Sequence, residues 1–138
     1  MQNMKLLKSM YKSAIENKDN LEKSLEKCED LNLKRDIEKN ILAYNKIISD
    51  CKIRYLEKNF SEKDLKKIGP FLNSNINIML SNKDSELANV ILQNSIENKV
   101  ILDSYLKEEK SYDEDLKNVC DRFINLENSI TNTFSKYV

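Results

Sequence analysis

Apolar residues recur at alternating three- and four-residue steps along most of the chain, which is the spacing of one face of an α-helix. The first series comprises Met4, Leu7, Tyr11, Ala14, Leu21, Leu25 and Cys28, with Lys18 as its one interruption. The second comprises Leu33, Ile37, Ile41, Tyr44, Ile48, Cys51 and Tyr55. These series predict helices over about residues 3–28 and 32–59, with Asn32 as N-cap of the second.

The middle of the chain contains its strongest helix breaks. Ser61-x-x-Asp64 has the pattern of a capping box and predicts a short helix over 62–67. Gly69 and Pro70 end that helix and begin a new segment. Apolar residues return at helical spacing between 70 and 81, and the polar stretch 81–86 predicts a break before the next helix.

Two further helices follow. Residues 84–109 carry one apolar side made of Leu87, Ala88, Ile91, Leu102, Tyr105 and Leu106. Ser111-x-x-Glu114 resembles a second capping box and predicts the start of the last helix. The apolar face of that helix comprises Tyr112, Leu116, Val119, Phe123, Leu126, Ile130, Phe134 and Tyr137.

Four helices of about 25 residues predict an all-α chain folded as one domain, an antiparallel up-down four-helix bundle roughly 37 Å long. The segment of about 62–81 adds short helical structure between the second and third helices.

The second helix has a further apolar line on the side opposite its main face. Its members are Leu42, Ile53, Leu56 and Phe60. One neighbouring helix cannot cover both sides, so we expect either residues 70–81 or another subunit to cover this line. These four residues form the candidate association surface.

Composition removes many classes of site. One glycine and one proline in 138 residues exclude the P-loop, the Rossmann unit and the β-sandwich. The absence of histidine excludes Ser-His-Asp and Cys-His catalysis, histidine-ligated zinc and the usual di-iron motif. We therefore expect no enzyme activity and no cofactor.

Charge and hydropathy bear on partners and location. The 23 basic and 23 acidic residues alternate, which argues against nucleic acid or an anionic membrane as the main partner. The N-terminus has no signal-peptide pattern, and no segment reaches the about 18 apolar residues of a membrane span. We expect a cytoplasmic protein with no membrane insertion.

The cysteines Cys28, Cys51 and Cys120 fall on apolar faces, where a free thiol behaves as a small hydrophobe. Bundle geometry separates Cys28 from Cys51 by roughly 25 Å, so we expect no disulfide between them. The six tyrosines also lie in or beside apolar faces, with their hydroxyl groups reaching the surface or a polar partner.

A polar layer interrupts the apolar side of the third long helix at Asn94, Ser95 and Asn98, with Lys18 or Tyr44 nearby. It has two interpretations. Hydrogen bonds within the layer fix the pairing of the helices, as a buried asparagine does in coiled coils. Alternatively, the layer is a small polar pocket that binds a ligand.

Carboxylates at similar heights suggest a di-metal centre, since Glu16, Glu97 and Glu127 lie level with Tyr44. Helical phase instead directs Glu16 and Glu97 toward water. Without histidine, and without a carboxylate from the second helix at that height, we expect no metal site.

The runs Leu6-Leu7-Lys8-x-x-Tyr11-x-x-Ala14, Tyr44-x-Lys46-Ile47 and Ala88-x-x-Ile91-Leu92-Gln93 resemble uncharacterised bacterial helical-bundle proteins allied to the ferritin-like superfamily. The resemblance implies a ferritin-like bundle, often without metal ligands, and no established activity. Glycines recur in that family at the positions of Asn17, Asn94 and Asn98, where this chain has asparagine.

The sequence therefore favours a non-enzymatic bundle that acts through helix-mediated association with a protein partner or with itself, as a homodimer. Two alternatives stay open. One is a degenerate ferritin-like protein that binds metal and handles iron, and the other is a carrier that holds a small ligand in the polar layer.

Overall fold

The computed structural model describes residues 2–68, 76–108 and 112–138, which are helical apart from short connections and contain no strand. Four long helices make up most of the molecule: α1 (Gln2–Lys27), α2 (Leu31–Glu57), α5 (Asp84–Glu108) and α6 (Glu114–Phe134). Two short helices, α3 (Glu62–Lys66) and α4 (Ile76–Leu80), lie between α2 and α5, and a 3₁₀ turn over Ser135–Tyr137 follows α6. The all-helical class and the four long helices agree with the sequence pattern.

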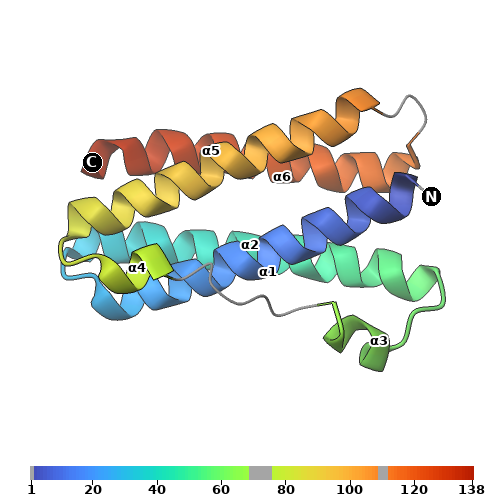
Figure 1. The fold of residues 1–138 in the computed structure, drawn as a ribbon, viewed down its shortest axis with the longest axis horizontal. Helices are drawn as coiled ribbons and strands as arrows, with labels where there is room; N and C mark the ends of the chain where they lie inside the picture. The colour runs from blue at the N-terminus through green and yellow to red at the C-terminus, as the bar shows by residue number, and fades with distance from the viewer. Residues whose placement is uncertain (1, 69–75, 109–111) are drawn as a thin grey trace.

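The long helices lie side by side in the cyclic order α1, α2, α6, α5, because each contacts the next in that order (Figure 1). All four neighbouring pairs are antiparallel (Figure 1). α5 nevertheless runs in the same direction as α2, because α2 ends at one end of the molecule and α5 begins at the other (Figure 1). The alternating up-down order expected from the sequence therefore does not extend across this connection.

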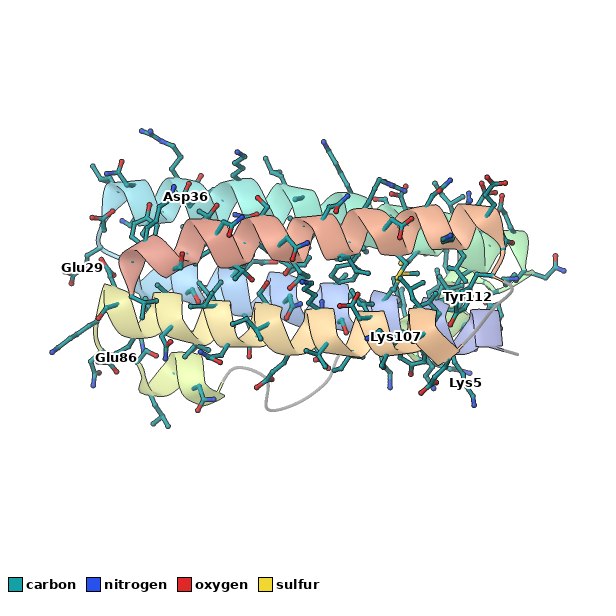
Figure 2. All side chains as sticks on the ribbon, turned by 90° about the horizontal axis from the view of Figure 1, so that it is seen from above. Lys5, Glu29, Asp36, Glu86, Lys107 and Tyr112 are labelled. Carbon is teal, nitrogen blue, oxygen red and sulfur yellow. The ribbon has the colours of Figure 1, made fainter. Side chains whose placement is uncertain are left out.

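The ends of the long helices meet at two poles of the molecule. Glu29 and Glu86 lie at one pole, and Lys5 and Tyr112 lie at the other (Figure 2). At the first pole the Asp84 carboxylate accepts hydrogen bonds from the backbone N–H groups of Glu29 at 3.0 Å and Asp30 at 2.8 Å. These bonds join the start of α5 to the turn between α1 and α2 and lower the pKa of Asp84.

The starts of α2 and α6 differ from the two predicted N-caps. α2 is capped by Asp30, whose side chain accepts from the N–H of Leu33, rather than by Asn32. α6 is capped by Asp113, and Ser111 lies outside the described residues. The capping box of Ser61 and Asp64 is confirmed. The break before α5 is also confirmed, while Gly69, Pro70 and residues 71–75 lie outside the described part of the chain.

α4 contacts α1 and α5, and the Lys27 ammonium at the end of α1 donates to the carbonyls of Ile78 and Met79 at 2.9 and 2.8 Å. Within its described part, the expectation that residues 70–81 cover the second apolar line of α2 is therefore wrong. The reason is the position of α4, which lies beside α1 and the start of α5 (Figure 1).

The core runs along the centre of the four long helices. Its largest fully buried side chains include Tyr44 and Tyr55 from α2 and Phe123 and Phe134 from α6. The rings of Tyr44 and Phe123 meet edge to face with centroids 6.0 Å apart. All three cysteines are free and buried, in agreement with their predicted role as core residues.

Candidate functional site

A buried carboxyl group lies near the middle of the core. Glu127 on α6 has no solvent-exposed surface, although the sequence pattern had placed Leu126 on the apolar face at this point. The Tyr44 hydroxyl on α2 donates a hydrogen bond to Glu127 Oε1. The Ser95 hydroxyl on α5 donates to the backbone carbonyl of Glu127 at 2.9 Å. Side chains from α2, α5 and α6 thus meet at one level.

Burial is the main cause of the pKa shifts of Glu127 and Tyr44. It raises the pKa of Glu127 to about 7, because the charged carboxylate is costly to remove from water, while the neighbouring polar groups of Tyr44, Ser95 and Asn98 oppose the shift. The pKa of Tyr44 lies well above its ordinary value, through burial and the proximity of Glu127. Near neutral pH the Glu127 carboxyl is therefore close to half-protonated, while the Tyr44 hydroxyl keeps its proton.

Several buried polar atoms at this level make no hydrogen bond of ordinary geometry within the described residues, although the Asn98 side chain still acts on Glu127 and the Asn17 side chain on Tyr44. They are Asn17 Nδ2, Asn20 Oδ1, Asn98 Nδ2, Asn98 Oδ1 and Glu127 Oε2. Asn20 and Asn98 are 4% and 5% exposed. Because buried polar groups are nearly always paired in native proteins, such a concentration requires a physical explanation.

A small cavity adjoins the side chains of Asn17 and Asn20, whereas Asn98 and Glu127 do not line it. It is lined by Asn17, Asn20, Leu21, Tyr44, Ile91, Asn94 and Ser95. The centre of a water-sized sphere has about 10 Å³ in which to move there, which is room for one particle of that size. Organic ligands do not fit this cavity as the structure has it.

On the outer side of the same asparagines, a groove of about 250 Å³ follows the contact between α1 and α5. Its lining includes Glu16 and Glu97, together with Asn17, Asn20, Asn94 and Asn98, and contains no lysine or arginine. Glu97 is exposed and Glu16 is half-buried, so both face the groove rather than the core. The asparagine side chains separate this acidic groove from the buried carboxyl group.

The structure brings together four of the five residues proposed for the polar layer. Tyr44, Ser95 and Asn98 are buried at this level and Asn94 lines the cavity. Lys18 does not join them, because its ammonium group pairs with Glu22 on the surface of α1 at 3.6 Å. Glu127, Asn17 and Asn20 complete the layer, and the sequence pattern had not assigned them to it.

Three members of the candidate association surface are exposed on α2: Leu42 at 64%, Ile53 at 46% and Leu56 at 45%. Phe60 is different, since it is only partly exposed and its ring packs on Tyr55 with centroids 5.1 Å apart. Its inclusion in the surface was wrong, because the chain turns after α2 and directs Phe60 back toward the core.

A groove of about 420 Å³ borders Leu42, between α2 and α6. Leu42, Ala43, Ile47 and Leu126 provide its apolar surface. Lys39, Lys46 and Arg122 provide its charges, and no acidic residue lines it. Arg122 pairs with Asp50, whereas Lys39 and Lys46 take part in none of the ion pairs found between described residues.

The tyrosine prediction is confirmed at Tyr44, at Tyr112, which donates to the Tyr105 carbonyl, and at Tyr137, which donates to Asp36. Tyr55 departs from it, since its buried hydroxyl has no partner among the described residues.

Across residues 2–68, 76–108 and 112–138, no group of three or more cysteine, aspartate or glutamate side chains is arranged to hold a metal ion. None of the helices in these ranges combines the length and apolar character needed to cross a bilayer.

Comparison with known proteins gives no relative: no protein family model, curated protein or solved structure matches the chain. The resemblance to ferritin-like bundles stays a prediction from the sequence.

Proposed function

We propose that the chain is an antiparallel four-helix bundle without catalytic activity, which acts by associating with a second copy of itself through the outward face of α2. The observation that carries this proposal is the exposed line of Leu42, Ile53 and Leu56. The parallel direction of the successive long helices α2 and α5 supports the bundle assignment, since bundles of the ferritin-like type have one such crossover.

The outward face of α2 is complementary to itself. Leu42 and Ile53 lie on one line because eleven residues make about three helical turns. When two copies of α2 meet antiparallel with their centres between residues 47 and 48, Leu42 of each copy lies opposite the partner's Ile53. Such a two-fold contact buries both apolar positions twice, which is the usual symmetry of soluble homodimers.

Charges on the same face favour a register that differs from the apolar one by half a residue. With the centre moved by half a residue, Lys39 lies opposite the partner's Glu57, and Lys46 lies opposite the partner's Asp50. Lys39 and Lys46 have no ion pair within their own copy among the described residues. Glu57 and Asp50 already contact Arg54 and Arg122, so in the dimer each acid lies between two basic groups. The charges therefore set the register while the apolar line supplies the main attraction.

The apolar part of the proposal is tested with Leu42→Lys, compared with Val100→Lys on α5. These positions are matched, since Leu42 is 64% and Val100 is 63% exposed. Sedimentation velocity over a range of concentrations should show a dimer for the wild type and for Val100→Lys. It should show at least about 30-fold weaker association for Leu42→Lys, which loses two buried leucines per dimer. A wild type that is monomeric at high micromolar concentration would contradict the proposal.

The register is tested by a charge exchange. Lys39→Glu and Glu57→Lys should each weaken the dimer by roughly fivefold, because each change affects two symmetry-related pairs. The double variant should recover the wild-type affinity. Residues 39 and 57 are about 27 Å apart along α2, so the recovery can arise only between copies. If the double variant associates as weakly as the two single changes predict together, the register is wrong.

A further inference from the structure

A long groove follows α5 on the side of the molecule that carries α1 and α4. Its first part, of about 410 Å³, lies between α4 and α5, and its second part is the groove of about 250 Å³ between α1 and α5. The two parts adjoin, because Asn94 and Glu97 line both. Together they form the α5 groove, which extends from Glu86 to Ile101, about 22 Å along the helix. This length suits a chain-like ligand better than a compact one.

The α5 groove is negatively charged along its length. Glu86 and Glu97 line its first part and Glu16 joins Glu97 in the second, whereas neither part is lined by lysine or arginine. Glu86 and Glu97 are exposed and take part in none of the ion pairs found between described residues. Burial raises the pKa of Glu16, and the neighbouring Lys12 opposes the shift. The groove therefore attracts a positively charged ligand and repels an anionic one.

Between its carboxylates the α5 groove offers groups that can hold a peptide. Asn89 and Gln93 have exposed side-chain amides, and each amide can pair with both the N–H and the C=O of an extended backbone. Leu80, which is 69% exposed, and Val90 add apolar surface. Asn20 lines the second part and is 4% exposed, and its Oδ1 has no hydrogen-bond partner among the described residues. A donor from the ligand satisfies such a buried acceptor.

We propose that the α5 groove binds an extended basic segment of a partner protein. Along α5, Val90 lies about 6 Å and Glu97 about 16 Å from Glu86. In an extended chain, residues two and four positions apart point to the same side and lie about 7 and 13 Å from the first. The segment therefore carries a basic, an apolar and a basic side chain at alternate positions, and the flexible lysine stems cover the remaining distance to the carboxylates.

This surface is separate from the outward face of α2. In the cyclic order of the bundle, α2 and α5 lie at opposite corners. The inference therefore goes beyond the proposed self-association, and either can fail while the other holds.

Fluorescence anisotropy near neutral pH and at low ionic strength tests the proposal on the whole chain. The probe is a labelled peptide in which lysine, leucine and lysine alternate with serine. It should bind the wild type, and a peptide with glutamine in place of both lysines should bind at least about tenfold more weakly, because two ion pairs are lost. This comparison needs no variant of the protein.

Two matched pairs of variants locate the peptide. Glu97→Gln should weaken binding about threefold, whereas Glu38→Gln on α2, an equally charged exposed change, should leave it unaltered. Leu80→Gln should weaken binding about fivefold through lost apolar contact. Met79→Gln should have no effect, since Met79 is 71% exposed, as Leu80 is 69%, but does not line the groove.

Equal affinity of the lysine and glutamine peptides would overturn the proposal, as would equal effects within either pair of variants. Displacement of the probe by spermidine as readily as by unlabelled peptide would also overturn it, because the ligand would then be a small polyamine. Self-association of the chain that Glu97→Gln weakens would do the same, since it would place a second copy in the groove.

Discussion

Replacing Glu127 by glutamine removes the one fully buried carboxyl group among the described residues while leaving its volume unchanged. The amide oxygen of glutamine can still accept the hydrogen bond from Tyr44. The variant removes the titration at this position. The buried amide NH2 adds a contribution that is the same at every pH, so the lost titration is seen in the pH dependence of the free energy of unfolding.

The magnitude follows from two pKa values. The pKa of an ordinary glutamate carboxyl is 4.5, and that of Glu127 in the folded chain is about 7. Between these values the folded protein holds the proton and the unfolded chain has released it. Stability is therefore fully present below pH 4.5 and is lost as pH rises toward 7. At about 1.4 kcal/mol for each pH unit, the loss reaches about 3 kcal/mol by pH 8. Glutamine suffers none of this loss.

The assay is urea unfolding followed by circular dichroism from pH 4 to pH 8.5 at constant ionic strength. The difference in unfolding free energy between Glu127→Gln and the wild type should rise by about 3 kcal/mol across this range and level off above pH 7. Glu97→Gln serves as the control and should follow the wild type. Parallel pH profiles for Glu127→Gln and the wild type would refute the reasoning, because they would mean that the carboxyl group is solvated in the folded state.

Three further predictions concern substitutions and labelling of core residues. Tyr44→Phe should lower the unfolding free energy by about 1–3 kcal/mol, because Glu127 Oε1 loses its donor, and urea unfolding at pH 5 measures the loss. Phe123→Ala should cost about 3–5 kcal/mol in the same assay, since the ring is fully buried. Cys51 and Cys120 should react with a thiol reagent only after unfolding, because both are fully buried and burial raises each thiol pKa to about 12. Rapid labelling of either cysteine in the native protein at pH 8 would contradict its placement.

The polar layer shows which residues of the site the sequence pattern can predict. Asn94, Ser95 and Asn98 were recognisable because they interrupt an otherwise apolar helix side. Glu127 was placed level with Tyr44, but its inward direction was not recognisable, because Leu126 beside it continues the apolar series of the last helix equally well. Helical phase puts both residues near the edge of that face. The rotation of α6 against α2, which places Glu127 on the Tyr44 hydroxyl, is decided by packing between helices.

The helix caps show the same limit on a smaller scale. Aspartate, asparagine and serine all cap helices by the same chemistry, and the stretch from residue 29 to residue 32 contains two of these types. Asp30 is the residue used, because the start that it sets carries Leu33 into the core. Local propensity selects the region of a helix start, and burial selects the residue.

By itself the sequence determined the four long helices, their inward faces, the buried cysteines and the break before α5. Periodicity defines the face that a helix buries because side chains at three- and four-residue steps share one side. Only the tertiary structure decided the direction of α5, the side of the molecule taken by α4, the burial of Glu127 and the inward turn of Phe60. These depend on which neighbour each face meets, and periodicity within one helix carries no information about its neighbour.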